Sequence, residues 1–174
     1  MKAYAGFWQR LKAFAFDYIV VSIYLVGLTL VTVLMRAITD IGQSLFAERV
    51  TAQVSGFLLV TFPITLYFVR GESSAQRATW GKQRAGLVVE DRNGDRVGFW
   101  RALTRTLLKF IPWELSHTLI WELYFSTDLN PAVINSGFVL VYGLIGLNIA
   151  SLVMSNSKQT LYDLLAGTYV VKRG

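Results

Sequence analysis

The sequence contains no cysteine and one histidine, His117. The lack of cysteine excludes disulfides, thiolate metal ligands and cysteine nucleophiles. Glu114 and His117 form a Glu-x-x-His pair, which is half of the motif that two-metal helical bundles use, and the other half is missing. We therefore expect no metal site and no cofactor.

Charged residues are also scarce. They make up 16% of the 174 residues, whereas hydrophobic residues make up 53%. A soluble domain has about 25% charged residues, so this composition indicates an integral membrane protein. The net charge of +6 comes from basic residues that flank apolar runs. The bias of basic residues toward the cytoplasmic side explains this charge without nucleic-acid binding.

Apolar runs long enough for transmembrane helices recur along the chain. About 20 apolar residues are needed to cross the hydrocarbon layer. The predicted spans are residues 14–35, 54–69, 107–125 and 132–154. The second is short and has Pro63 near its middle, which predicts a kink whose freed carbonyl a neighbouring helix must satisfy.

The third span leaves two topologies open, because Pro112 and several ionisable side chains interrupt its apolar run. If residues 107–125 cross the membrane, the protein has four spans and both termini are cytoplasmic. If they do not, it has three spans and one interfacial or re-entrant helix. The basic residues near the carboxyl terminus favour four spans, because basic residues gather on the cytoplasmic side.

Residues 70–110 form the basic part of the chain, and we expect them to be cytoplasmic. Residues 87–98 predict a short β-hairpin, because Asn93-Gly94 is a strong turn pair. Residues 99–110 predict a basic amphipathic helix that lies on anionic headgroups. Its basic face consists of Arg101, Arg105 and Lys109. The predicted fold is therefore an all-α integral membrane protein, one domain over residues 1–174, with these two cytoplasmic additions.

Several familiar catalytic and metal-binding motifs are incomplete in this sequence. Gly81-Lys82 lacks the order of a phosphate-binding loop, because Gln83 follows the lysine where Ser or Thr is needed. No serine lies in the sequence context of a hydrolase nucleophile. Asp91, Asn93 and Asp95 resemble the start of a calcium loop, but the closing glutamate is missing. We therefore expect no enzyme activity.

Ionisable residues inside the third predicted span are candidates for function. They are Glu114, His117 and Glu122. Such groups are costly at membrane depth and mark functional sites by default, and a histidine beside a carboxylate can relay protons near neutral pH. The alternative is an interfacial helix whose acids face water.

Three separate segments carry a family resemblance. Arg10 and Asp17 lead the first span, Thr79-Trp-Gly81-Lys82-Gln-Arg-Ala-Gly86 follows the second, and Gln159-Thr-Leu-Tyr-Asp163 lies near the end of the chain. Together and in this order they resemble the RDD family of small bacterial membrane proteins. The matching positions are Arg10, Asp17, Thr79, Gly81, Lys82, Gly86 and Asp163. Tyr162 departs from the family pattern, which often has histidine there, and residues 112–157 match no motif.

The resemblance implies a multi-pass protein of the bacterial inner membrane, and it implies a fold better than an activity. Some members look like transporters, and cation/proton antiport has been proposed within the family. Two roles stay open for Arg10, Asp17 and Asp163: a structural clasp between the first helix and the tail, or a part in ion passage.

Two functions remain as hypotheses. The first is a small transporter that exchanges monovalent cations for protons and works as an oligomer. Its candidate path consists of Asp17, Glu114, His117 and Glu122. The alternative is a non-transporting accessory, assembly or scaffold subunit of a larger membrane complex. Under either hypothesis, the expected partners are anionic lipid headgroups and a second protein, either another copy or a larger complex.

Overall fold

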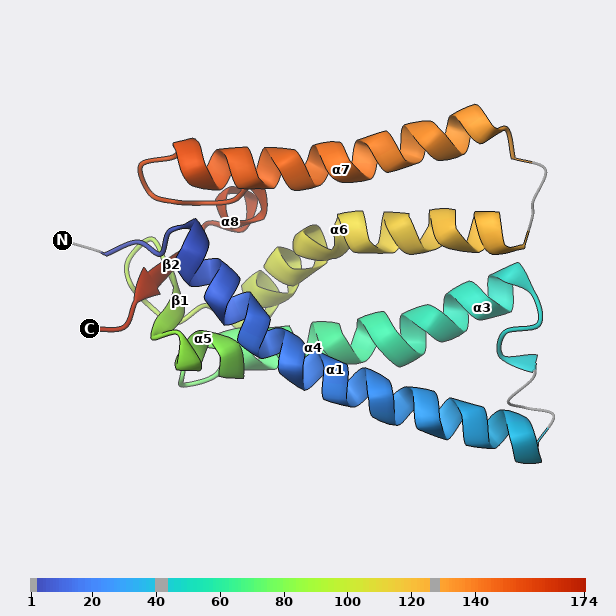
Figure 1. Cartoon of the computed structure of the whole chain (residues 1–174). Helices are drawn as coiled ribbons and strands as arrows, with labels where there is room; N and C mark the ends of the chain where they lie inside the picture. The colour runs from blue at the N-terminus through green and yellow to red at the C-terminus, as the bar shows by residue number, and fades with distance from the viewer. Residues whose placement is uncertain (1–2, 40–43, 126–128) are drawn as a thin grey trace.

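Four long helical stretches lie lengthwise beside one another in the computed structural model (Figure 1). The structure describes residues 3–39, 44–125 and 129–174. The first stretch is α1 (Phe7–Ile38), the third is α6 (Phe99–Tyr124) and the fourth is α7 (Pro131–Met154). The second is continuous through α3 (Arg49–Gly56), the π-helical segment η1 (Phe57–Thr61) and α4 (Phe62–Ser73).

The long helices confirm a membrane protein. Among the described residues, three helices are long and apolar enough to cross a bilayer: Phe7–Ile38, Arg49–Ser73 and Pro131–Met154. They contain all of the predicted spans 14–35, 54–69 and 132–154, and the last of these begins one residue inside α7. α6 has 26 residues, about 39 Å at 1.5 Å per residue, and it lies alongside α4 and α7 (Figure 1).

A small two-stranded sheet bears on whether α6 crosses the membrane. β1 (Leu87–Asp91), which precedes α6, pairs antiparallel with β2 (Thr168–Lys172), which follows α7. The two strands therefore lie on the same side of the membrane, and the chain between them crosses it an even number of times. Since α7 is one crossing, α6 is the other. The pairing supports the four-span topology over the three-span alternative.

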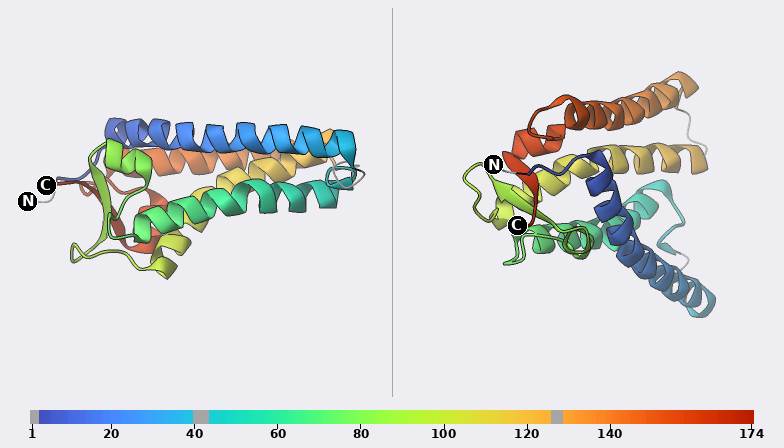
Figure 2. Two further views of the ribbon diagram at one scale, coloured as in Figure 1. Left: turned by 90° about the horizontal axis from the view of Figure 1, so that it is seen from below. Right: turned by 60° about the vertical axis from the view of Figure 1, so that its left-hand side comes forward.

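Both termini, the sheet and the two short helices α5 (Trp80–Arg84) and α8 (Leu161–Ala166) lie at one end of the bundle (Figures 1 and 2). We call this the terminal end. The opposite end, where α1 leads to α3 and α6 leads to α7, is the loop end. The compact apolar core sits at the terminal end and joins α1, α4, α6 and both strands. It consists of Ala5, Ala13, Val69, Leu87, Val89, Val97, Ala102 and Val170.

The first strand of the predicted hairpin at residues 87–98 pairs mainly with a strand from the end of the chain, and not with the second half of the hairpin. The turn is present, because Gly94 has a φ of +91° and its N–H donates to the Asp91 carbonyl, and Glu90 forms a single bridge with Arg96. The ladder of β1, however, runs to β2 from the other end of the chain, with Val89 opposite Val170. β1 is buried, so it needs a second strand that is also apolar, and Val170 and Val171 supply it.

The predicted surface helix over residues 99–110 is the first part of α6 and not a separate element. α6 continues through Pro112 and bends part-way along its length (Figure 1). The prediction that its basic face meets headgroups is wrong for Arg105, which is 2% exposed. Charge periodicity identifies a face, but it does not say whether lipid phosphate or a buried carboxylate lies opposite.

Pro63 produces the predicted irregularity, in the form of a π-helical turn. Proline lacks the N–H that would bond to the carbonyl of Leu59 four residues earlier. The segment Phe57–Thr61 is π-helical, and the Tyr24 hydroxyl of α1 donates to the Leu59 carbonyl at 2.5 Å. A neighbouring helix thus satisfies the freed acceptor, as a hydrocarbon environment requires.

Candidate functional site

Asp17 of α1 is buried and fully hydrogen-bonded. The Tyr67 hydroxyl donates to Oδ1 at 2.6 Å, the Thr79 hydroxyl to Oδ2 at 2.7 Å and the Gly81 N–H to Oδ1 at 2.7 Å. Thr79 also caps α5, since its Oγ1 accepts from the Lys82 N–H. One carboxylate therefore ties α1 to α4 and to the start of α5.

Gly81 is the point of closest approach between α5 and α1. A Cβ at this position would lie 2.2 Å from the Ala13 carbonyl oxygen and 2.6 Å from Cγ of Asp17. Both distances are shorter than any non-bonded contact. Only glycine lets the α5 backbone come near enough for its N–H to reach Asp17, which explains the Thr-x-Gly spacing of this segment.

Asp163 joins two arginines from different helices. It is fully buried at the start of α8. Arg10 of α1 donates from Nη1 to its Oδ2 at 2.5 Å, and Arg105 of α6 donates from Nε to its Oδ1 at 2.8 Å. Arg10 also donates to the carbonyls of Ala5 and Lys158. The tail of the chain is thereby fastened to α1 and α6.

Glu72 of α4 extends the same arrangement. It is fully buried and accepts from Arg105 Nη1 at 2.7 Å on both oxygens and from Lys82 Nζ at 2.9 Å. Arg105 therefore bridges Glu72 and Asp163. We call these five residues the charge cluster: Arg10, Glu72, Lys82, Arg105 and Asp163.

The charge cluster keeps Asp163 ionised. Burial would raise the pKa of this carboxyl, but Arg105 and then Arg10 stabilise its charged form, so the pKa lies below its usual range. Such a carboxylate does not take up a proton near neutral pH. Its geometry fits the clasp that the sequence allowed, in which the tail fastens the first helix.

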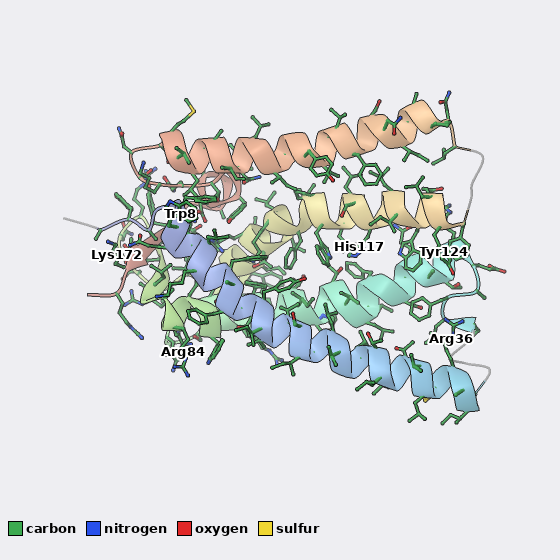
Figure 3. The ribbon with its side chains drawn as sticks, in the orientation of Figure 1. Trp8, Arg36, Arg84, His117, Tyr124 and Lys172 are labelled. Atoms are coloured by element: carbon green, nitrogen blue, oxygen red, sulfur yellow. The ribbon has the colours of Figure 1, made fainter. Side chains whose placement is uncertain are left out.

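The four residues of the predicted ion path lie in three places. Asp17 is at the terminal end. Glu122 of α6 forms an ion pair with Arg49 of α3 near the loop end. Glu114 and His117 lie between them on α6, with His117 Nδ1 3.9 Å from Oε1 of Glu114. In Figure 3, His117 points into the space between α6 and the α3–α4 stretch. The structure therefore brings Glu114 and His117 together but not all four.

Two cavities occupy the bundle. The terminal-end cavity has a volume of about 530 Å³ and lies among α1, α4, α6 and α7. The loop-end cavity is smaller, about 140 Å³, and its lining includes Gln53, Glu114 and His117. Thr61 lines the first cavity, and its hydroxyl donates to Glu114, which lines the second. This hydrogen bond therefore links the lining of one cavity to the lining of the other.

Sequence reasoning did not identify Glu72 and Arg105 as site residues. Glu72 is the only acidic residue from position 49 to position 89, at the end of an apolar span and beside the basic region. That isolation is a usable indication of a buried ion pair. Arg105 carried no such indication, because it shares its spacing with Arg101, which is half exposed and pairs with Asp91.

Six of the seven family-motif positions meet at this end of the molecule through Asp17 or the charge cluster. The seventh, Gly86, has a φ of +67° and makes the turn from α5 into β1. The sequence model of the RDD family matches residues 4–167, nearly the whole chain. The search of curated proteins and the search of solved structures give no match.

Proposed function

Because the chain belongs to the RDD family, we propose that this membrane protein is a small transporter that exchanges monovalent cations for protons. The observation that supports the proposal best is the hydrogen bond between Thr61, which lines the terminal-end cavity, and Glu114, which lines the loop-end cavity. In the proposed path, a cation passes from one cavity to the other when this contact opens.

Glu114 is the group on which exchange would depend. Its carboxylate is next to the hydroxyl of Thr61, and oxygen ligands of this kind suit hard cations. A proton and a cation compete for the same carboxylate, which couples their movements. His117, 3.9 Å away, can carry the proton between Glu114 and the loop-end cavity near neutral pH.

Thr61 has a place in the backbone that suits a gate. It is the last residue of η1, two residues before Pro63. Single π-helical turns are frequent at functional sites, because they can shift register at small cost. A change from π- to α-helical geometry in η1 would rotate Thr61 and break its contact with Glu114. Asp17 and the charge cluster then serve as the fixed base against which this segment moves.

We propose that the terminal end is cytoplasmic and that the membrane is the bacterial inner membrane. Among the described basic residues, only Arg36 and Arg49 lie at the loop end, and the others belong to the terminal half. Basic residues are concentrated on the cytoplasmic side of membrane proteins. Anionic headgroups at that face and a second copy of the chain are the partners we propose, and we assign no chemical reaction to the protein.

Ion flux in proteoliposomes that contain only the purified protein tests the proposal. A pH-sensitive dye reports proton movement when sodium, lithium or potassium is added. We expect cation-driven proton movement that Glu114→Gln lowers at least tenfold, since the amide cannot exchange a proton. Asp95→Asn, the same acid-to-amide change at an exposed position, should leave it unchanged.

No flux from well-folded protein with any of the three cations would overturn the exchange proposal. It would favour the accessory-subunit hypothesis. That alternative has its own support, because no residue in the apolar window of α1 is buried, and the exposed side chains offer a surface to another membrane protein. Equal flux from the wild type and Glu114→Gln would leave a transporter but exclude Glu114 as its exchange site.

A further inference from the structure

The terminal-end cavity has an unbalanced charge. Four cations line it, Arg10, Lys82, Arg105 and Lys109, together with one carboxylate, Asp17. The acids Glu72 and Asp163 are hydrogen-bonded to three of those cations. Four cations against three carboxylates leave one positive charge in a buried, mostly apolar space.

Lys109 is the basic residue of this cavity that has no carboxylate partner among the described residues. Among the described residues, no carboxylate lies within ion-pair distance of its ammonium, which lies 3.2 Å from the centre of the Phe68 ring and 4.8 Å from that of Phe110. Ring faces compensate a cation only in part. A buried ammonium needs an anion, and the described part of the chain does not provide one.

The rest of the cavity is suited to hydrocarbon. Phe14 and Val21 of α1 and Ile145 and Ile149 of α7 line its sides. Phe14, Ile145 and Ile149 are also exposed at the surface, so the cavity opens between α1 and α7. These two helices diverge from the terminal end toward the loop end (Figures 1 and 2). In a membrane this opening faces the acyl chains.

We propose that the terminal-end cavity binds one anionic phospholipid, with the phosphate on Lys109 and an acyl chain between α1 and α7. The volume of about 530 Å³ is within the range of about 300–1,000 Å³ that is usual for ligand sites. A lipid fits better than a soluble anion, because the opening lies on the apolar flank of the bundle. The proposal does not rest on ion exchange, although a bound lipid would occupy the terminal-end part of the path proposed for the cation.

Native mass spectrometry of the purified protein tests the proposal. The protein is released from detergent after incubation with phosphatidylglycerol or with the neutral phosphatidylcholine. We expect wild-type protein to keep phosphatidylglycerol preferentially. Lys109→Gln should bind it about tenfold more weakly, since a charge-assisted hydrogen bond is lost, whereas Lys109→Arg should keep the preference. Lys172→Gln, the same change at an exposed position on β2, should have no effect.

A second variant keeps the test informative if Lys109→Gln does not fold. Ile145→Trp leaves the lysine in place and fills the acyl-chain part of the cavity, so it should also expel the lipid. Equal retention of the two lipids by the wild type, or unchanged binding by Ile145→Trp, would overturn the proposal. Displacement of the lipid by millimolar inorganic phosphate would overturn the lipid as the occupant and indicate a free anion. The readout is bound lipid, so it is separate from the flux measurement.

Discussion

At the scale of single residues, the molecule is organised by carboxylates that each join several elements. Asp17 accepts three hydrogen bonds, one each from α4, from the Thr79 cap and from α5. Asp163 accepts hydrogen bonds from two arginines. A buried ion pair adds little net stability compared with an apolar pair of the same shape. The loss of one partner, in contrast, leaves an uncompensated charge and costs about 3–5 kcal/mol. These residues therefore fix which segments meet.

Asp163→Asn tests the clasp at this scale. The amide leaves Arg10 without a carboxylate partner and Arg105 with Glu72 alone, so we expect a loss of about 3 kcal/mol in unfolding free energy and a lower folded yield. Thermal unfolding in detergent measures the change. The exposed Asp95→Asn should shift stability by less than about 0.5 kcal/mol. Normal yield and stability of Asp163→Asn would argue against the clasp.

The pH dependence of stability follows from the same carboxyl. Its pKa is lower in the folded protein than in the unfolded chain, where it is about 3.9. The stabilisation is therefore fully present above about pH 4 and is lost as the pH falls through the folded pKa. Unfolding at graded pH should show this decline in the wild type, and Asp163→Asn should lack this part of it. An unchanged profile in the variant would assign the decline to other acids.

Gly81→Ala tests the close approach of α5 to α1. The added Cβ would meet the Ala13 carbonyl oxygen and Asp17, and backbone must move to admit it. We expect a loss of about 3 kcal/mol or more in thermal stability, at the upper end of overpacking effects. Gly27→Ala in α1 is the control, since a Cβ there has no neighbour within 4 Å. Its effect should be neutral or slightly stabilising, because alanine favours helix.

At the scale of elements, the irregular turn in the second helical stretch depends on a proline in that stretch and a tyrosine of α1. Pro63 frees the Leu59 carbonyl, η1 takes up the irregular turn, and Tyr24 of α1 supplies the missing donor. The same turn carries Thr61 to Glu114 of α6. The irregular turn at Pro63 thus lies beside the contact between Thr61, which lines the terminal-end cavity, and Glu114, which lines the loop-end cavity.

Tyr24→Phe should cost about 1 kcal/mol, because it leaves the Leu59 carbonyl without its donor. Pro63→Ala restores a backbone N–H, so the tyrosine should matter less in that background. A double-mutant cycle on thermal stability measures this coupling, which we expect to be at least 0.5 kcal/mol. Tyr142→Phe, at an exposed position of α7, serves as control. Additive effects of Tyr24→Phe and Pro63→Ala would show that the two residues do not act together.

At the scale of the whole molecule, the two-stranded sheet constrains the topology. It joins the segment after α4 to the end of the chain, and the Ala5 N–H donates to the Val170 carbonyl, which adds the amino terminus. Each pairing requires an even number of crossings between the joined segments. Four crossings satisfy both, so the pairings favour α6 as a further span, although α6 is not among the three helices that length and composition identify.

Labelling of single cysteines checks this topology, and the native chain offers no competing thiol. Asp95→Cys and Lys172→Cys flank α6 and α7 at the terminal end, and Leu129→Cys lies between them at the loop end. We expect a membrane-impermeant thiol reagent to label Leu129→Cys in intact cells. The other two should react only after permeabilisation. Asp95→Cys and Lys172→Cys on opposite sides would contradict the four-span topology.

The membrane class, the three apolar spans, the turn at Asn93-Gly94 and the family-motif positions could all be predicted from the amino-acid sequence. These features depend on local composition and short spacing, which the chain carries without reference to its fold. The kink at Pro63 was predictable for the same reason, since a proline alters its own backbone wherever it lies.

The interaction partners of the charged side chains and of β1 could be read only from the folded structure. Arg105 and Asp163 are 58 positions apart, and Asp17 and Gly81 are 64 apart. The strand that completes β1 is at the end of the chain. Periodicity tells which face of a helix a charge occupies, but not which distant segment packs against that face. The packing of α4, α6 and α8 therefore decides that Arg105 pairs with Glu72 and not with a lipid phosphate. A buried charge is stable only when a group of opposite charge lies beside it.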